Sequence, residues 1–246
     1  MNKKENKPLL SIIIPVFNET ERVANLYQVW EYLKKKKLSN EIIVVDDGSV
    51  DDTYKKLIVL QKKFNFKLIR YSLNKGKGNA VKMGMLQAEG LYFLFMDVDL
   101  STPLTEISHL LPYLKKYPVV IGTRKTQQAK LLVRQSLIRE NMGKIFTLIS
   151  RLTLWMSVSD FTCGFKCFTA AAGKEIFIRQ TIERWGFDAE ILYIAKKIGY
   201  QIYEVPVSWK NDRHTKVKFP LDIIRSLFDL IQIRINDFRQ VYSKRL

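Results

Sequence analysis

The sequence has few of the residues that mark specialised classes of protein. Its two cysteines, Cys163 and Cys167, are too few for a disulfide scaffold, and its two histidines lie far apart in the chain, so a Cys/His zinc site is not expected. The 11 glycines and 7 prolines exclude a collagen-like or low-complexity chain. Because 47% of its 246 residues are hydrophobic, the chain can form a sizeable core without such staples.

Long hydrophobic runs are also absent. A membrane-spanning helix needs about 18 or more apolar residues in a row, and charged side chains interrupt the two best candidates, Ile145–Val158 and Phe219–Ile235. Residues 1–8 are polar and rich in lysine, without the apolar core of a signal peptide. We therefore expect a cytoplasmic chain with reduced thiols, no signal peptide and no transmembrane helix.

Basic residues are in excess. The 41 lysines and arginines outnumber the 24 acidic residues, which gives a formal net charge of +17. Such an excess favours a polyanionic partner, namely nucleic acid, anionic lipid or a phosphorylated substrate. The sequence has no aromatic-interleaved RNA-binding strands and no helix motif that reads DNA, so we expect no nucleic-acid partner and keep a basic nucleic-acid-binding protein only as a distant alternative.

Short apolar runs alternate with amphipathic helical patterns through the first half of the chain. This alternation predicts an α/β fold with a mostly parallel sheet covered by helices on both faces. It fades after Gly122, and an amphipathic C-terminal helix is expected over Phe219–Val241. The expected strands are Leu10–Ile14, Glu41–Val45, Lys67–Tyr71, Tyr92–Met96 and Val119–Ile121, and the expected helices are Glu21–Lys36, Asp52–Phe64, Asn79–Glu89 and Leu104–Lys116.

Acidic residues follow three of these strands: Glu19 after the first, Asp46 and Asp47 after the second, and Asp97 and Asp99 after the fourth. In an open parallel sheet, ligands bind at the carboxyl ends of the strands. Acids gathered there repel one another unless a cation lies among them, and Mg²⁺ or Mn²⁺ bound together with substrate phosphates meets that need.

Glycine-rich nucleotide motifs are missing, because neither a G-x-G-x-x-G turn nor a P-loop is present. The short Gly76-Lys77-Gly78 segment is either a turn into the next helix or a loop that contacts phosphate. Asp51 and Asp52 are better explained as residues that cap a helix.

Five motifs in order carry a family resemblance. Leu10–Glu19, Val44–Ser49 and Asp97-Val98-Asp99 resemble inverting family 2 glycosyltransferases, whose fold is the Rossmann-like GT-A fold. Asp160–Lys166 and Glu183–Glu190 resemble the dolichyl- or polyprenyl-phosphate glucosyltransferases, near the dolichyl-phosphate mannose synthases. The resemblance implies a polar tail at 1–8 and a GT-A domain at 9–218. That domain has a nucleotide-sugar half (9–124) and an acceptor half (125–218), and an amphipathic helix with a basic tail follows at 219–246.

The resemblance also implies roles for single residues. Asp99 would ligate the metal, with Ser101 at a position where mannose synthases often carry a longer Gln ligand. Asp99, Asp160 and Asp188 are the implied catalytic residues, with Glu190 a third choice of general base after Asp160 and Asp188. The acceptor phosphate would meet Arg139, Arg213 and Lys216. The implied nucleotide-sugar site comprises Pro15, Phe17, Glu19, Val45, Asp47, Asp97, Val98, Asp99 and Arg124.

The function implied is an inverting, metal-dependent transfer of a hexose, first of all glucose from UDP-glucose, to a polyprenyl or dolichyl phosphate at a membrane surface. Two alternatives stay open, namely transfer to a saccharide hydroxyl and the use of GDP-mannose. A hydroxyl acceptor needs a general base, whereas a lipid phosphate, with a second pKa of about 6, is already largely a dianion at neutral pH. Further expected partners are an anionic membrane surface on the cytoplasmic side and a membrane protein or a second copy of the chain.

Overall fold

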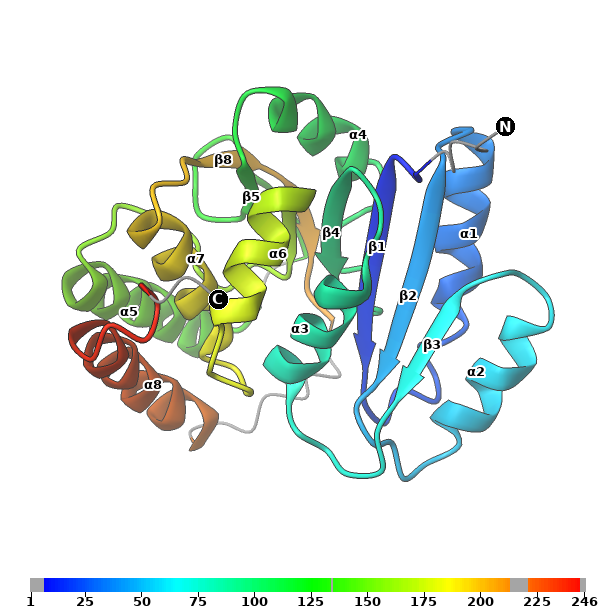
Figure 1. Cartoon of the computed structure of the whole chain (residues 1–246), viewed down its shortest axis with the longest axis horizontal. Coiled ribbons are helices and arrows are strands. Elements are labelled where there is room, and N and C mark those ends of the chain that lie inside the picture. Colours follow the sequence, from blue (N-terminus) through cyan, green and yellow to red (C-terminus); the bar gives the residue numbers. More distant parts are fainter. Residues whose placement is uncertain (1–6, 134, 213–220, 244–246) are drawn as a thin grey trace.

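The structure is a computed structural model that describes residues 7–133, 135–212 and 221–243, and its helices and strands are shown in Figure 1. The strands are β1 (Leu10–Val16), β2 (Asn40–Asp46), β3 (Lys67–Arg70), β4 (Tyr92–Met96), β5 (Val119–Thr123), β6 (Lys130–Val133), β7 (Phe165–Thr169), β8 (Ile202–Pro206) and β9 (Ser208–Lys210). The helices are α1 (Asn25–Lys35), α2 (Thr53–Gln61), α3 (Lys77–Gln87), α4 (Glu106–Leu110), α5 (Leu137–Leu154), α6 (Ala170–Arg179), α7 (Phe187–Lys197) and α8 (Leu221–Phe238).

Seven strands form one sheet in the order β3-β2-β1-β4-β7-β5-β8. All neighbours are parallel except β7, which runs antiparallel to both β4 and β5. The remaining pair, β6 and β9, forms a small parallel sheet of its own. Strands from the expected nucleotide-sugar and acceptor halves therefore share a single sheet, and β7 joins them.

Two apolar layers cover the two faces of the sheet. Successive side chains of a strand point to opposite faces, and β1 shows the consequence: Ile13 packs in one buried cluster while Ile12 and Ile14 pack in the other. The first cluster lies under α3, α6 and α7, and the second lies under α1 and α4. In Figure 1, α3 and α6 cross the face turned to the viewer. The predicted α/β sheet covered on both faces is thus confirmed.

The boundaries of the predicted elements differ from the structure in instructive places. Tyr92–Met96 is reproduced as β4, and the other expected strands match to within a few residues. The expected helix Leu104–Lys116 instead divides into α4 and a 3₁₀ helix at Leu111–Lys115. Pro112 has no N–H to donate to the preceding turn, so a continuous α-helix cannot pass through it.

The strand β7 was not expected at all, because Lys166 interrupts its apolar sequence. This lysine is fully buried, and its ammonium group is paired with Asp188 on α7. The partner lies 22 residues further along the chain, so a local pattern cannot reveal that a lysine fits the centre of a sheet here. The reversal places the loop before β7 beside the end of β4, where Met96 pairs with Phe165.

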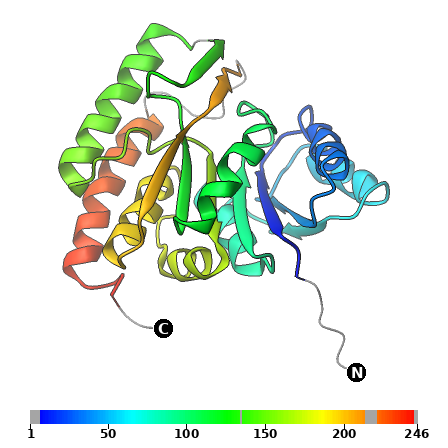
Figure 2. The ribbon, with the colours of Figure 1, turned by 90° about the horizontal axis from the view of Figure 1, so that it is seen from above.

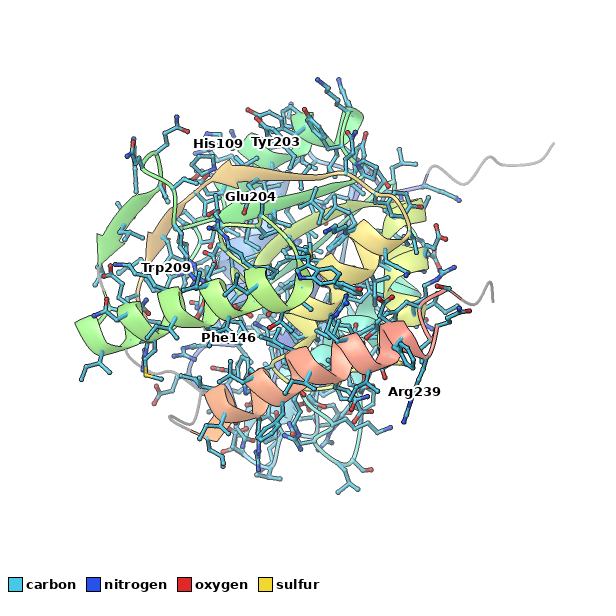
Figure 3. The ribbon with its side chains drawn as sticks, turned by 90° about the vertical axis from the view of Figure 1, so that its left-hand side faces the viewer. His109, Phe146, Tyr203, Glu204, Trp209 and Arg239 are labelled. Carbon is cyan, nitrogen blue, oxygen red and sulfur yellow. The ribbon has the colours of Figure 1, made fainter. Side chains whose placement is uncertain are left out.

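The amphipathic C-terminal helix is present as α8, within the predicted span. It packs beside α5, as both turned views show (Figures 2 and 3). Among the described residues, no helix combines the length and the apolar character needed to cross a bilayer.

Candidate active site

The carboxyl ends of β1, β2 and β4 meet at one edge of the sheet, the lower edge in Figure 1. The Asp97-Val98-Asp99 loop leaves β4 there. Asp99 accepts a hydrogen bond from the amide of Ser101 at 2.9 Å, across Leu100, whose φ of 53° is left-handed. A leucine in that region costs about 1–2 kcal/mol. The surrounding structure therefore holds this loop in a fixed shape, and the Ser101 carbonyl is tied to Lys210 of β9 at 2.8 Å.

A lysine lies among these acids. Lys77, at the start of α3, places its ammonium 2.6 Å from Asp97. Burial acts to lower the pKa of Lys77, but the carboxylates of Asp97 and Asp188 outweigh it, and the net shift is upward. The Gly76-Lys77-Gly78 segment leads into α3, which agrees with the interpretation as a turn into the next helix. It also brings a positive charge to the edge of the sheet that carries Asp97 and Asp99, which we name the acidic edge.

Its two glycines make that approach possible. A Cβ on Gly76 would lie 2.5 Å from the carbonyl oxygen of Glu183, and one on Gly78 would lie 2.7 Å from that of Ile182. Only glycine lets the first turn of α3 pack this closely against the Glu183–Glu190 segment.

The antiparallel strand β7 adds a second lysine, and α7 adds its partner carboxylate. Lys166 donates to Asp188 in the first turn of α7, and it also donates to the Cys163 carbonyl. Burial raises the pKa of Asp188 even though Lys166 and Lys77 act in the opposite direction. Gly164 packs against Asp97, since a Cβ there would lie 2.2 Å from the carboxylate oxygen Oδ2.

The charges of this cluster do not cancel. Asp97, Asp99 and Asp188 are opposed by Lys77 and Lys166, so three carboxylates meet two ammonium groups. Burial and the neighbouring Asp97 raise the pKa of Asp99, as expected where negative potential is incompletely neutralised. Within the described residues, no three His, Cys, Asp or Glu side chains form a metal cluster. The carboxylate oxygens of Asp97 and Asp99 are donors that fit a hard cation such as Mg²⁺ or Mn²⁺, which is commonly held by one or two carboxylates together with substrate phosphates.

Arg124, at the end of β5, forms a bidentate ion pair with Asp160. Its Nε and one terminal nitrogen donate to the two carboxylate oxygens at 2.7 and 2.9 Å. Burial would raise the pKa of Asp160, but Arg124 outweighs it and holds the pKa well below its usual range. The carboxylate is fully buried, whereas a fifth of the Arg124 side chain remains exposed. Asp160 therefore fixes the direction of a guanidinium that can still reach an anion.

A hollow of about 1040 Å³ opens beside this edge, between the segments that follow β1, β2 and β3. Glu19 lines it, bonded to Arg22 at 2.9 Å, and Arg70 lines it with its guanidinium 3.8 Å from the centre of the Tyr54 ring. The expected nucleoside residues Pro15 and Phe17 are half-buried on the same segment as Glu19.

Three other residues of the expected nucleotide-sugar site lie deeper. Asp47 is buried, and its carboxylate accepts hydrogen bonds from the amides of Lys75 and Gly76 at 2.9 and 2.8 Å and from the Asn74 side chain. Burial raises its pKa. Val45 is wholly buried against α3, so only its backbone could meet a ligand. Val98 is also buried, and its carbonyl accepts from Asn25 at 2.9 Å.

The expected acceptor residues are less completely described. Arg139 is half-buried in the first turns of α5, whereas Arg213 and Lys216 lie outside the described residues. Glu190, the third choice of base, accepts hydrogen bonds from the amides of Thr181 and Ile182 and from the Tyr242 hydroxyl at 2.8 Å. These bonds tie the segment before α7 to the C-terminal region.

Comparisons with known proteins agree with this arrangement. Residues 11–177 match the model of glycosyl transferase family 2. The chain belongs to glycosyl transferase family 2. The predicted enzyme class, a glycosyltransferase, is thereby confirmed.

Two relatives match nearly all of the chain. The dolichyl-phosphate beta-glucosyltransferase of Saccharomyces cerevisiae is 33% identical over 98% of this chain and 78% of its own length. The enzyme of the same name from Dictyostelium discoideum is 33% identical over 92% of this chain and 73% of its own length. The resemblance stated from the motifs is therefore confirmed.

Solved structures share the fold. Glucosyl-3-phosphoglycerate synthase from Mycobacterium tuberculosis, in complex with UDP, superposes with a TM-score of 0.64 at 18% identity and covers 92% of this chain and 80% of its own. A mannosyltransferase from Pyrobaculum calidifontis, in complex with GDP-Man and Mn²⁺, gives 0.61 at 17% identity and covers 96% and 65%. The predicted GT-A fold is confirmed.

Sequence reasoning missed Lys166 and Gly164 as parts of the site and left Lys77 undecided. The two glycines that flank Lys77 were the available signal, since each marks a close backbone approach. Lys166 lies within the Asp160–Lys166 motif, but its pairing with Asp188 could not be predicted, because only the fold brings the two residues together.

Proposed function

We propose that this chain transfers glucose from UDP-glucose to a dolichyl or polyprenyl phosphate, with inversion at the anomeric carbon, on the cytoplasmic face of a membrane. The observation that carries the proposal is the 33% identity, over 98% of the chain, to a relative named for this activity. The geometry of the acidic edge supports it at the donor, at the leaving group and at the acceptor.

The donor would lie across the edge of the sheet. We place its nucleoside in the hollow beside Glu19, over the loop that Asp47 holds. Its diphosphate would then reach the exposed part of Arg124 and the ammonium of Lys77, which now faces Asp97. Both cations are positioned by buried or half-buried carboxylates before the donor arrives, which is the preorganisation that stabilises developing charge.

Asp99 would hold Mg²⁺ or Mn²⁺, with Ser101 as the second proposed ligand. When bound, the ion supplies further positive charge to the departing nucleoside diphosphate. The net negative charge left among Asp97, Asp99 and Asp188 supports a cation at this place.

The acceptor would supply its own nucleophile. A lipid phosphate, with a second pKa of about 6, is mostly a dianion at neutral pH, so its oxygen attacks the anomeric carbon as the bond to the diphosphate breaks and no proton has to be removed. The two candidate bases support this account, because Asp160 is engaged by Arg124 and Asp188 by Lys166. We propose that both act by positioning these cations and that Arg139, Arg213 and Lys216 receive the acceptor phosphate.

A donor comparison with purified protein tests the proposal. The chain is incubated with Mg²⁺ or Mn²⁺, a short polyprenyl phosphate and either UDP-glucose or GDP-mannose, and the lipid product is identified by mass spectrometry. We expect a polyprenyl phosphate that carries one hexose from UDP-glucose. Faster transfer from GDP-mannose would replace glucose by mannose in the proposal, and no lipid product from either donor would overturn it.

A further inference from the structure

Glu190 is a buried carboxylate that the proposed reaction does not use. It lies in the first turn of α7 and is fully buried. Its two oxygens accept hydrogen bonds from the amides of Thr181 and Ile182 at 3.0 and 2.8 Å. The hydroxyls of Thr181 and Tyr242 also donate to it, at 2.5 and 2.8 Å. Because both oxygens are buried and hydrogen-bonded, this carboxylate is not placed to remove a proton from an acceptor.

An asparagine of α8 fixes the direction of these hydrogen bonds. The side-chain oxygen of Asn236 accepts from Gln232 at 2.8 Å. Its nitrogen donates to the hydroxyls of Thr181 and Tyr242 at 2.9 and 3.2 Å. A hydroxyl has one proton, so each of these two must give its proton to Glu190. Every donor around Glu190 therefore points at it, and a carboxylate, which accepts at both oxygens, completes the arrangement.

Tyr242 brings the turn after α8 into this arrangement. Its side chain is fully buried, and its ring lies edge-on to that of Tyr193 on α7, with the ring centroids 6.1 Å apart. Its carbonyl accepts a hydrogen bond from Arg179 of α6 at 3.0 Å. The helices α7 and α8 lie side by side (Figure 2). The turn after α8 is thus connected to the start of α7 through Glu190.

The two amides that Glu190 holds belong to the segment between α6 and α7, which forms a wall behind the Gly76-Lys77-Gly78 segment. Gln180, also buried, donates from its side chain to the Gly78 carbonyl at 3.0 Å. The carbonyl of Glu183 accepts from the amide at the next position of α3, Asn79, at 2.9 Å. The two glycines already approach the carbonyls of this wall as closely as a Cβ would forbid. The position of the glycine segment therefore follows the position of the wall.

We propose that Glu190 and Tyr242 are positioning residues for the donor. They hold the segment between α6 and α7, and this segment fixes the ammonium of Lys77 for the donor diphosphate of the proposed reaction, on which this inference rests. The ammonium lies 2.6 Å from Asp97 and 5.5 Å from the ring centre of Trp185, which belongs to the same segment. The turn after α8 thereby supports the donor side of the site. Small displacements of a group that contacts the reacting atoms are costly, since about 1 Å can lower a rate about a hundredfold.

The variant Tyr242→Phe tests the proposal because it removes one hydrogen bond and keeps the buried ring. UDP affinity is measured by calorimetry with Mn²⁺, and we expect the dissociation constant to rise at least about threefold. The half-saturating concentration of UDP-glucose should rise with it, whereas that of a short polyprenyl phosphate should not change. Partial unfolding would instead lower the rate and leave both half-saturating concentrations where they are.

A second variant covers the carboxylate itself. Glu190→Gln keeps the shape of the side chain, but its amide nitrogen would face the N–H of Thr181 or of Ile182, whichever way it is turned. We expect UDP to bind about tenfold more weakly or worse. Wild-type UDP affinity in both Tyr242→Phe and Glu190→Gln would overturn the proposal.

Tyr200→Phe is the matched control. Tyr200 is half-buried, and its hydroxyl also donates to a glutamate, Glu175, at 2.7 Å, away from the segment between α6 and α7. Its loss should leave UDP affinity and the half-saturating UDP-glucose concentration as in the wild type. Equal shifts in Tyr242→Phe and Tyr200→Phe would overturn the proposal, because the effect would then be a general loosening of the domain.

The route through Lys77 is tested by combining variants. Lys77→Met removes the ammonium, so adding Tyr242→Phe to it should weaken UDP binding no further. An equal fold-loss from Tyr242→Phe in the wild type and in Lys77→Met would overturn the positioning of Lys77.

Calorimetry with UDP needs no acceptor, which keeps the two proposals apart. If the wild type transferred no sugar to polyprenyl phosphate while Tyr242→Phe still weakened UDP binding, the proposed function would fall and the positioning role would stand. Transfer by the wild type, with UDP affinity unchanged in both Tyr242→Phe and Glu190→Gln, would have the opposite meaning.

Discussion

At the scale of single residues, the acidic edge is a set of paired charges with one negative charge in excess. Lys77 faces Asp97, Lys166 is paired with Asp188, and Asp99 keeps a raised pKa. The sequence alone predicted Asp97 and Asp99, because they follow an apolar strand, and the family resemblance implied Asp188. The pairing of Lys166 with Asp188 was not predicted, because only the fold brings the two residues together.

Asp99 is the residue on which divalent-ion dependence should rest. We expect Asp99→Ala to lower the rate of sugar transfer at least about a hundredfold, because the charge of the leaving diphosphate loses several kcal/mol of stabilisation. Initial rates with Mg²⁺ or Mn²⁺, with calorimetry of Mn²⁺ binding in the presence of UDP, measure the effect. Full activity of the wild type in EDTA, or a variant near the wild-type rate, would remove the metal role.

Asp47 should matter to donor affinity more than to the chemical step. Its carboxylate holds the amides of Lys75 and Gly76, just before Lys77. Asp47→Ala releases this loop, and the loss of a buried charged acceptor is worth roughly 1.5–3 kcal/mol. We expect UDP affinity to fall about tenfold or more in calorimetry, with a smaller change in the rate at saturating donor. Unchanged UDP affinity would contradict the role of Asp47 in holding this loop for donor binding.

Asp160 should contribute strongly to stability. Removing one partner of a buried ion pair costs about 3–5 kcal/mol, so Asp160→Asn should lower the free energy of unfolding in urea by that order. Asp52→Asn is the matched control, because Asp52 and its partner Lys55 are largely exposed at 62% and 83%, and no measurable change is expected there.

The ion pair between Arg124 and Asp160 should also make the stability of the protein depend on pH. The folded-state pKa of Asp160 lies below its unfolded value, so its contribution is present in full above the unfolded pKa of about 3.9 and is lost as the pH falls toward the folded one. The wild type should therefore lose more stability than Asp160→Asn as the pH is lowered below about 4. Parallel losses in the two proteins would contradict the pair's role.

At the scale of helices and strands, apolar alternation was enough to predict β1 to β5 and the α/β class. It failed at β7, where a buried lysine replaces an apolar residue, and at β8, where four of the five residues are only half-buried. The amphipathic C-terminal helix predicted over Phe219–Val241 is present as α8. In the structure it packs through one side and leaves the other exposed.

Close packing of α3 on β1 depends on Gly84. A Cβ added there would lie 2.4 Å from Cγ2 of Ile13, so Gly84→Ala should cost about 1–3 kcal/mol of stability through overpacking. Gly143 lies inside α5, and a Cβ there would have only the Lys125 Nζ within 4 Å, at 3.9 Å. Gly143→Ala should instead gain about 0.5–1 kcal/mol, since alanine is the better helix former. Equal effects of the two substitutions on urea unfolding would contradict this contrast.

At the scale of the whole molecule, one sheet carries both sides of the proposed reaction. The parallel strands β1 to β4 present the donor side, and the reversed strand β7 brings Asp160 and Lys166 to the same edge. The helices α5 and α8 lie at the end of the molecule away from β2 and β3, as Figure 2 shows. The net charge of +17 suits the proposed reaction, because both the donor and the acceptor carry phosphate groups.

The most direct measurement compares acceptors with a single donor. Purified chain, UDP-glucose and a divalent ion are incubated in detergent with a short polyprenyl phosphate, the matching polyprenol or a free saccharide, and the initial rate is recorded as a function of pH. We expect transfer to the phosphate alone, with a rate that falls as the pH drops through about 6, where the dianion takes up a proton, and that is flat above it. Glucosylation of polyprenol or of the saccharide as fast as of the polyprenyl phosphate would contradict it.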